Sequence, residues 1–152
     1  MNKILLTEVD LAARLFQFGI LRHIESSEFG LYMTDLCYYA KNFDNSKNFD
    51  CLKEMVNNGV IKIIELNEPQ MERSGKLYRR FYPKFLLKTV SAFVIATEGN
   101  FSLISEDELV RSVAIKDLGI PSYGKQWLVD LIINNIKDET IVANAGLLRL
   151  VI

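Results

Sequence analysis

The sequence is poor in the residues that build disulfides, zinc sites and histidine-based catalytic centres. Among its 152 residues there are two cysteines and one histidine. Cys37 and Cys51 lack the close spacing of a redox motif or a zinc site and lie among apolar residues, so we expect buried free thiols. His23 falls late in the first predicted helix without a neighbouring nucleophile, so interaction with the helix C-terminus explains it better than general-base catalysis.

The sequence also lacks long apolar runs and an excess of charge of one sign. A net charge of −1 gives no overall attraction to nucleic acid or to membranes. The apolar stretch near the N-terminus is short and is interrupted by Glu8, Asp10 and Arg14, so we expect neither a signal peptide nor a membrane span. Together with the free thiols, this predicts a cytoplasmic protein that does not bind membranes.

What is present is the composition of an ordinary globular domain, with 49% hydrophobic and 24% charged residues. A chain of this length buries about two thirds of the surface that its unfolded form exposes. It needs neither a disulfide nor a structural metal to fold. No internal repeat, low-complexity segment or linker interrupts it, so we expect a single domain spanning residues 1–152.

Short apolar runs alternate with helical patterns along the chain. Strands are predicted at 3–6, 30–34, 60–66 and 101–105. Helices are predicted after Thr7 as N-cap through residue 24, from Thr34 and Asp35 to 39, and at 49–59, 85–100, 106–119, 127–135 and 139–151. The stretch NEPQMERSG (67–75) is interpreted as a polar loop. This alternation predicts an α/β fold of three layers, α/β/α, with a central, mainly parallel sheet.

Ligands of such sheets bind at the carboxyl ends of the strands, which directs attention to Thr7, Thr34 with Asp35, and the segment 105–107. The sequence SEDE at 105–108 has two interpretations. Ser105 and Glu108 have the spacing of a capping box at a helix start. Glu106 and Asp107 are also oxygen ligands of the kind that divalent cations prefer.

The C-terminal half combines several motifs in a fixed order. A buried helix at 85–100 is followed by a strand that ends in a Ser-x-Asp turn at 105–107, by Gly-Ile-Pro at 119–121 and by Gly-x-x-Trp-Leu at 124–128. These motifs and the order of elements resemble the PIN-domain family of metal-dependent nucleases, which includes bacterial toxin ribonucleases. The resemblance covers essentially the whole chain and is most specific after residue 85.

The resemblance implies about four clustered carboxylates that hold Mg²⁺ or Mn²⁺ and activate water against a phosphodiester. In this sequence the first of these positions falls at Thr7, the second near Tyr38–Ala40, and the third at Thr89, or at Lys88 in the neighbouring register. Only the last falls on an acid, Asp107, which has Glu106 beside it. We therefore expect a degenerate member of the family, with Asp107 as a weak metal ligand.

Other acids leave a second interpretation open. Glu8, Asp10 and Asp35 could join Glu106 and Asp107 in a rearranged catalytic site, and the protein would then be an active Mg²⁺- or Mn²⁺-dependent ribonuclease. Against this, Glu8 and Asp10 suit the first turn of a helix and Asp35 suits an N-cap. We favour a catalytically silent binding or regulatory module without a firmly held cofactor, in a toxin–antitoxin-like context.

A basic segment suggests what such a module could bind. Aromatic residues are interleaved there with six cations: Arg73, Lys76, Arg79, Arg80, Lys84 and Lys88. These residues could follow a phosphate backbone while the aromatic rings stack on bases of single-stranded RNA. The alternative is a solvated helix face whose aromatic residues point into the core. A partner protein, and a homodimer through the apolar helices near 9–24 and 49–56, are further expectations.

Overall fold

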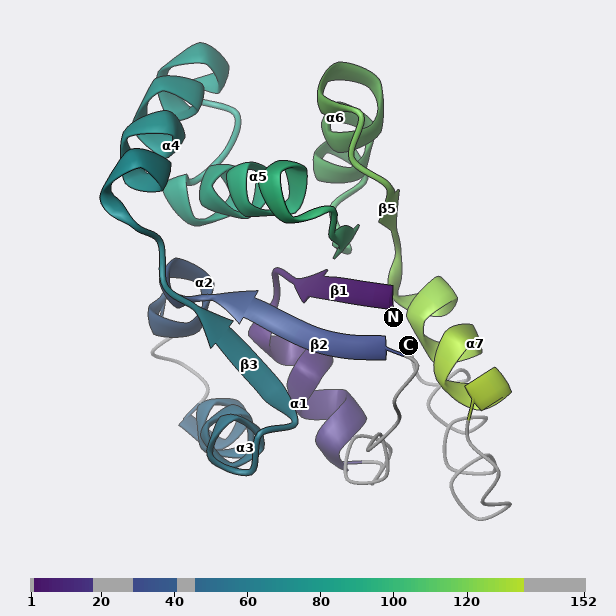
Figure 1. Cartoon of the computed structure of the whole chain (residues 1–152). Helices are drawn as coiled ribbons and strands as arrows, with labels where there is room; N and C mark the ends of the chain where they lie inside the picture. The colour runs from purple at the N-terminus through teal and green to yellow at the C-terminus, as the bar shows by residue number, and fades with distance from the viewer. Residues whose placement is uncertain (1, 18–28, 41–45, 136–152) are drawn as a thin grey trace.

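A computed structural model describes residues 2–17, 29–40 and 46–135 of the chain. Its centre is a five-stranded sheet in which every pair of neighbouring strands is parallel, in the order β3-β2-β1-β4-β5. Helices cover both faces of the sheet (Figure 1). The prediction of a three-layer α/β fold is confirmed.

The strands are β1 (Asn2–Leu6), β2 (Phe29–Thr34), β3 (Ile61–Ile64), β4 (Ser102–Ile104) and β5 (Ser122–Tyr123). β1 lies at the centre, where Leu5 is paired with Tyr32 on one side and with Leu103 on the other. Ile4, Leu5 and Leu6 are all buried, because a central parallel strand has helices on both faces. The central position of β1 explains why its apolar residues are consecutive and do not alternate with polar ones.

The two faces of the sheet have separate cores. Ile4 and Leu6 pack with α1 (Val9–Gln17), α2 (Asp35–Tyr39), α3 (Ser46–Asn57) and α7 (Lys125–Asn135). Leu5, which points to the opposite face, packs with α4 (Glu68–Phe81), α5 (Leu87–Gly99) and α6 (Glu108–Leu118). Alternation of side chains along one strand therefore divides the hydrophobic residues between the two helical layers.

α5 is the central helix of the second layer, as its apolar sequence predicts. Its residues from Val90 to Ala96 are all buried, and Phe93 is completely so. The Phe93 ring meets Phe81 and Phe85 edge-on, at centroid distances of 6.5 and 5.5 Å. The aromatic residues that surround the basic segment thus include two core residues, Phe81 and Phe85.

The prediction of a polar loop at 67–75 is wrong, because these residues begin the long helix α4. Asn67 and Gln70 form a reciprocal capping box, in which each side chain accepts from the backbone N–H of the other at 2.9 Å. Pro69 occupies the first turn, where a missing N–H costs nothing. The segment has almost no buried apolar residue before Phe81, so hydrophobic periodicity did not reveal the helix.

Smaller differences concern short elements and ends. β5 was not among the strands predicted from apolar runs, because only two residues form it and pairing with β4 is what identifies it. The helices predicted at 49–59 and 106–119 lie at 46–57 and 108–118. Cys37 is buried as expected and Cys51 only partly so; both are free thiols. The predicted helix at 139–151, the end of the first helix at 18–24 and His23 lie outside the described residues.

Candidate functional site

The carboxyl edge of the sheet has a topological switch point beside β1. The chain proceeds from β1 to β2 and β3 on one side, then crosses to β4 and β5 on the other. Thr7 follows β1 and Ser105 follows β4, so these two residues lie where the direction of the crossovers reverses. In open parallel sheets this crevice is where ligands bind.

Thr7 connects the two strands at the switch point. Its side chain is buried, and its hydroxyl donates to the Ile104 carbonyl at 2.8 Å. The prediction that Thr7 is the N-cap of the first helix is wrong, since α1 begins at Val9 and the hydroxyl is used as a donor across the sheet. A carboxylate at this position could not donate to Ile104 and would face a carbonyl dipole instead.

Glu8 lies just before α1 and not in its first turn as predicted, and its side chain reaches the turn after β4. Its carboxylate accepts from the Glu106 backbone N–H at 2.9 and 3.1 Å and from the Ser105 hydroxyl at 3.1 Å. Burial raises the pKa of Glu8, and nearby Glu106 and Asp107 raise it further, although these hydrogen bonds act in the opposite direction. The negative charge of Glu8 is therefore costly, and its oxygens are occupied by the chain itself.

The next two acids are also held by local partners. Glu106 accepts from the Lys125 backbone N–H at 2.9 Å, and its other oxygen lies 3.2 Å from the Lys125 ammonium nitrogen. Asp107 is the N-cap of α6 and accepts from the backbone N–H groups of Leu109 and Val110. The predicted capping box of Ser105 and Glu108 is therefore wrong; a carboxylate two residues further along performs the capping.

Asp35 and Asp10 lie at the starts of other helices. Thr34, fully buried, is the N-cap of α2 and accepts from the Cys37 backbone N–H at 3.2 Å. Asp35 is in the first turn, where its carboxylate accepts from the Leu36 N–H at 2.8 Å, so its predicted place as N-cap is one residue off. Asp10 is exposed in the first turn of α1.

The structure brings together part of the predicted acidic set. Glu8, Asp10 and Glu106 line a polar pocket of about 280 Å³, together with Arg14 and Lys125. Asp35 is not among the lining residues. Within the described ranges, no three acidic, histidine or cysteine side chains are arranged so that they could hold a metal ion.

Sequence reasoning missed two features of this site that depend on contacts between distant segments. One is the donor function of Thr7, which depends on the neighbouring strand end. The other is Lys125, whose position beside Glu106 depends on the pairing of β5 with β4. Only contacts between distant segments identify them, so no local signal was available.

The basic segment is divided between several surroundings. On α4, Arg73 forms an ion pair with Glu98 of α5. The ammonium nitrogen of Lys76 lies 3.6 Å from a carboxylate oxygen of Glu72. Arg79, Arg80 and Lys84 are exposed, and Lys88 is half-buried at the start of α5.

Comparisons with known proteins bear on the fold. No protein-family model matches the sequence, and no curated protein matches it either. Among solved structures, a chain of VapBC-1 from nontypeable Haemophilus influenzae matches 83% of this chain and 99% of its own length, with a TM-score of 0.54 and 15% identity. VapBC is a toxin–antitoxin pair whose toxin is a PIN domain.

The fold is PIN-like. At this level of identity the likeness concerns the path of the chain and not its chemistry. At the positions that the PIN resemblance assigned to acids, Tyr38 is buried, Tyr39 is exposed, and Lys88 and Thr89 are half-buried.

No helix in the part of the chain that the structure describes is both long and apolar enough to span a bilayer.

Proposed function

We propose that this chain is a PIN-like module without a working metal centre, which acts by binding. The observation that carries the proposal is the hydrogen bond from Thr7 to the Ile104 carbonyl. Thr7 thus places a neutral hydrogen-bond donor at the switch point. The PIN resemblance expects the first metal-binding carboxylate at this same position. Without that ligand, a site for Mg²⁺ or Mn²⁺ lacks one of the charges that hold a hard cation.

The acids nearby support the same proposal. Glu8 accepts three hydrogen bonds from the turn at 105–106, Glu106 is paired with Lys125, and Asp107 caps α6. A cation entering here would have to displace the Lys125 ammonium and several backbone donors. The donor set therefore does not fit a tightly held divalent ion.

A partner protein is the binding function that we favour. The structural neighbour VapBC-1 is a two-protein assembly, and the match covers 99% of the aligned VapBC-1 chain. We propose by analogy a toxin–antitoxin-like context, in which this chain binds a partner protein and not a substrate. Arg73 and Lys76 already face carboxylates of this chain, which leaves fewer cations for a nucleic-acid backbone.

Single-stranded RNA is a second candidate, favoured by one surface at the end of α4. Tyr82 is 66% exposed, and the exposed cations Arg79 and Lys84 flank it in the sequence. An exposed ring between cations is suited to stacking on a base while the cations meet phosphates. Binding that weakens steeply with added salt, and weakens in a Tyr82→Ala variant, would support this candidate; no binding at low salt would exclude it.

The experiment that tests the silent centre is an assay of single-stranded RNA cleavage in millimolar Mn²⁺. We expect no metal-dependent cleavage by the purified protein. An active ribonuclease with rearranged acids is the alternative, because Glu8, Asp10 and Glu106 line one pocket. Cleavage that is abolished by Glu8→Gln and by Asp107→Asn, but kept by the exposed control Glu108→Gln, would establish that alternative.

A further inference from the structure

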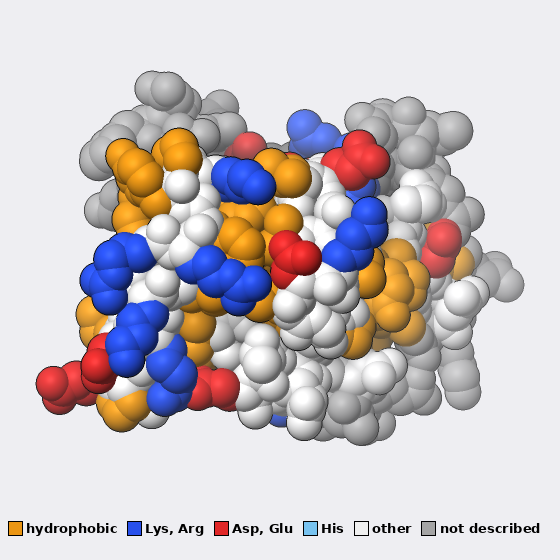
Figure 2. Space-filling view, turned by 90° about the horizontal axis from the view of Figure 1, so that it is seen from above, with side chains coloured by type: hydrophobic (Ala, Val, Ile, Leu, Met, Phe, Trp, Pro, Cys, Tyr) orange, Lys and Arg blue, Asp and Glu red, His pale blue; other side chains and the backbone are white. Residues whose placement is uncertain are grey.

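The layer formed by α4, α5 and α6 contains an apolar groove on its outer surface. Its floor is formed by Leu77 of α4, Phe93 and Val94 of α5, and Leu118 of α6. Seen from above this layer, apolar side chains are exposed in a hollow that is bordered by Lys and Arg side chains and also by acidic atoms (Figure 2). We refer to this hollow as the α4–α6 groove.

The α4–α6 groove is large enough for a small ligand. Its volume is about 380 Å³, within the range of about 300–1,000 Å³ that small-molecule sites occupy. The polar atoms at its walls are already satisfied in part, since the Thr97 hydroxyl donates to the Phe93 carbonyl at 2.9 Å. The floor therefore offers apolar contact and almost no hydrogen bonding.

The apolar floor is bordered by the cations Arg73, Lys76 and Arg80 and by the carboxylate Glu98, and the cations differ in how well they are neutralised. Arg73 pairs with Glu98, and Lys76 lies near Glu72. The Arg80 guanidinium carbon lies 5.0 Å from the centroid of the Phe81 ring. No carboxylate in the described part of the chain pairs with Arg80. The groove thus has an uncompensated guanidinium at one end.

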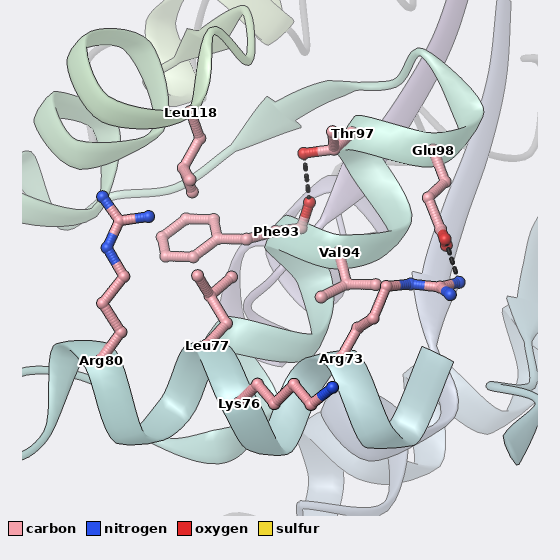
Figure 3. A pocket seen from close by; sticks show the side chains of 9 residues that line it. All are labelled: Arg73, Lys76, Leu77, Arg80, Phe93, Val94, Thr97, Glu98 and Leu118. Carbon is pink, nitrogen blue, oxygen red and sulfur yellow. Dashed lines mark hydrogen bonds and ion pairs between the residues drawn. The ribbon is translucent and has the colours of Figure 1, made fainter. Parts of the chain in front are cut away.

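Arg80 is also directed toward the apolar part of the groove. Its guanidinium lies beside the Phe93 ring and the Leu118 side chain, with Leu77 below them (Figure 3). An anionic group bound there would accept two parallel N–H donors, and the apolar body attached to it would lie along the floor. Lys76 lies on the same rim but is already near Glu72, so Arg80 is the favoured partner of the anion.

We propose that the α4–α6 groove binds a small organic anion with an apolar body, such as a medium-chain or aromatic carboxylate. Arg80 holds the carboxylate, and Leu77 and Leu118, which are partly exposed, contact the carbon chain. The proposal goes beyond the binding function above, because the groove lies on the outer face of the second helical layer and not at the carboxyl edge of the sheet.

The test uses octanoate as the probe, with octan-1-ol and octylammonium as matched ligands of the same chain length. NMR titration of the full chain should show shifts at Leu77, Val94 and Leu118 on addition of octanoate. We expect octanoate to bind about tenfold more tightly than either matched ligand, since a charge-assisted bidentate contact is lost in both.

Two neighbouring arginines provide the matched variants. Arg80→Gln should weaken octanoate binding about tenfold, and Arg80→Glu should reverse the preference toward octylammonium. Arg79→Glu makes the same change in net charge on the same helix, outside the groove, and should change octanoate affinity less than about twofold. Both side chains are exposed, so neither change should unfold the protein.

Three results would overturn the proposal. The first is octan-1-ol binding as tightly as octanoate, which would reduce the groove to apolar contact alone. The second is equal weakening by Arg79→Glu and Arg80→Glu, which would assign the effect to overall charge. The third is the absence of shifts at the groove residues up to the solubility limit of octanoate.

Discussion

At the scale of single residues, Thr7 has the most informative position, because one hydroxyl connects the ends of β1 and β4. The predicted consequence concerns stability. Thr7→Val keeps the shape of the side chain but leaves the Ile104 carbonyl without this donor, and should lower the free energy of unfolding by about 1–2 kcal/mol. Urea denaturation monitored by circular dichroism measures it.

The matched control for this change is Thr97→Val. The Thr97 hydroxyl also donates to a backbone carbonyl, that of Phe93, but on an exposed turn of α5 where water can replace it. Its loss should change stability by less than about 0.5 kcal/mol. Equal effects of the two substitutions would contradict a special contribution of the buried strand-end hydrogen bond.

Glu8 gives a prediction about pH. Burial raises its pKa above the ordinary value of 4.5, so the folded protein retains this proton at pH values where the unfolded chain has lost it. Glu8 therefore contributes most to stability at or below that ordinary value, and the contribution is lost as pH rises through the raised folded value. The wild type should thus lose stability relative to Glu8→Gln as pH increases from acid toward neutral.

Urea denaturation of both proteins across this pH window provides the measurement. Glu108→Gln removes an exposed carboxylate from the nearby start of α6 and serves as the matched control. A difference between wild type and Glu8→Gln that stays constant across the window would contradict the prediction. So would a difference that changes in the opposite direction, since that would mean a folded pKa below the ordinary value.

At the scale of elements, helix starts are determined by side chains that accept backbone N–H groups. Asp107→Ala removes the acceptor for Leu109 and Val110 and should cost about 1 kcal/mol of folding free energy. Asp107→Asn, which keeps a capping oxygen, should cost less. Thermal denaturation of the two variants measures these costs, with Glu108→Gln as the control. If Glu108→Gln loses as much stability as Asp107→Ala, the capping box that the sequence suggested would be the correct interpretation.

α4 permits the same experiment at a helix whose start was not predicted. Asn67→Ala removes one half of the capping box with Gln70 and should lower stability by about 1 kcal/mol. Asn58→Ala, which changes an exposed asparagine after the end of α3, is the control and should be close to neutral. An unchanged unfolding midpoint in Asn67→Ala would mean that packing of α4 on α5 alone fixes this helix.

The same elements show why sequence patterns predict some helices and miss others. α5 is apolar on all sides because it lies between the sheet and α4, and its sequence is recognised without further information. α4 is exposed along most of its length, so hydrophobic periodicity does not indicate this helix. The residues that indicate its start are Asn67, Pro69 and Gln70. The Asn-x-x-Gln spacing with an early proline was the available signal.

At the scale of the whole molecule, the proposed lack of a working metal centre has a simple thermodynamic consequence. A ligand that binds the folded state alone raises its stability, by about 2.7 kcal/mol at one hundred times its dissociation constant. We expect millimolar Mn²⁺ to leave the melting temperature of this protein unchanged. A rise that disappears in Asp107→Asn would contradict the proposed silent centre.

The sequence by itself determined the class of fold, because alternating apolar runs and helical patterns allow little besides a parallel sheet between two helical layers. It also determined which helix is buried and where most strands end. Tertiary structure alone decided the chemistry of the carboxyl edge. Whether Thr7 donates to Ile104, and whether Lys125 faces Glu106, depends on strand pairing between segments far apart in the chain, and side-chain geometry of that kind leaves no local pattern.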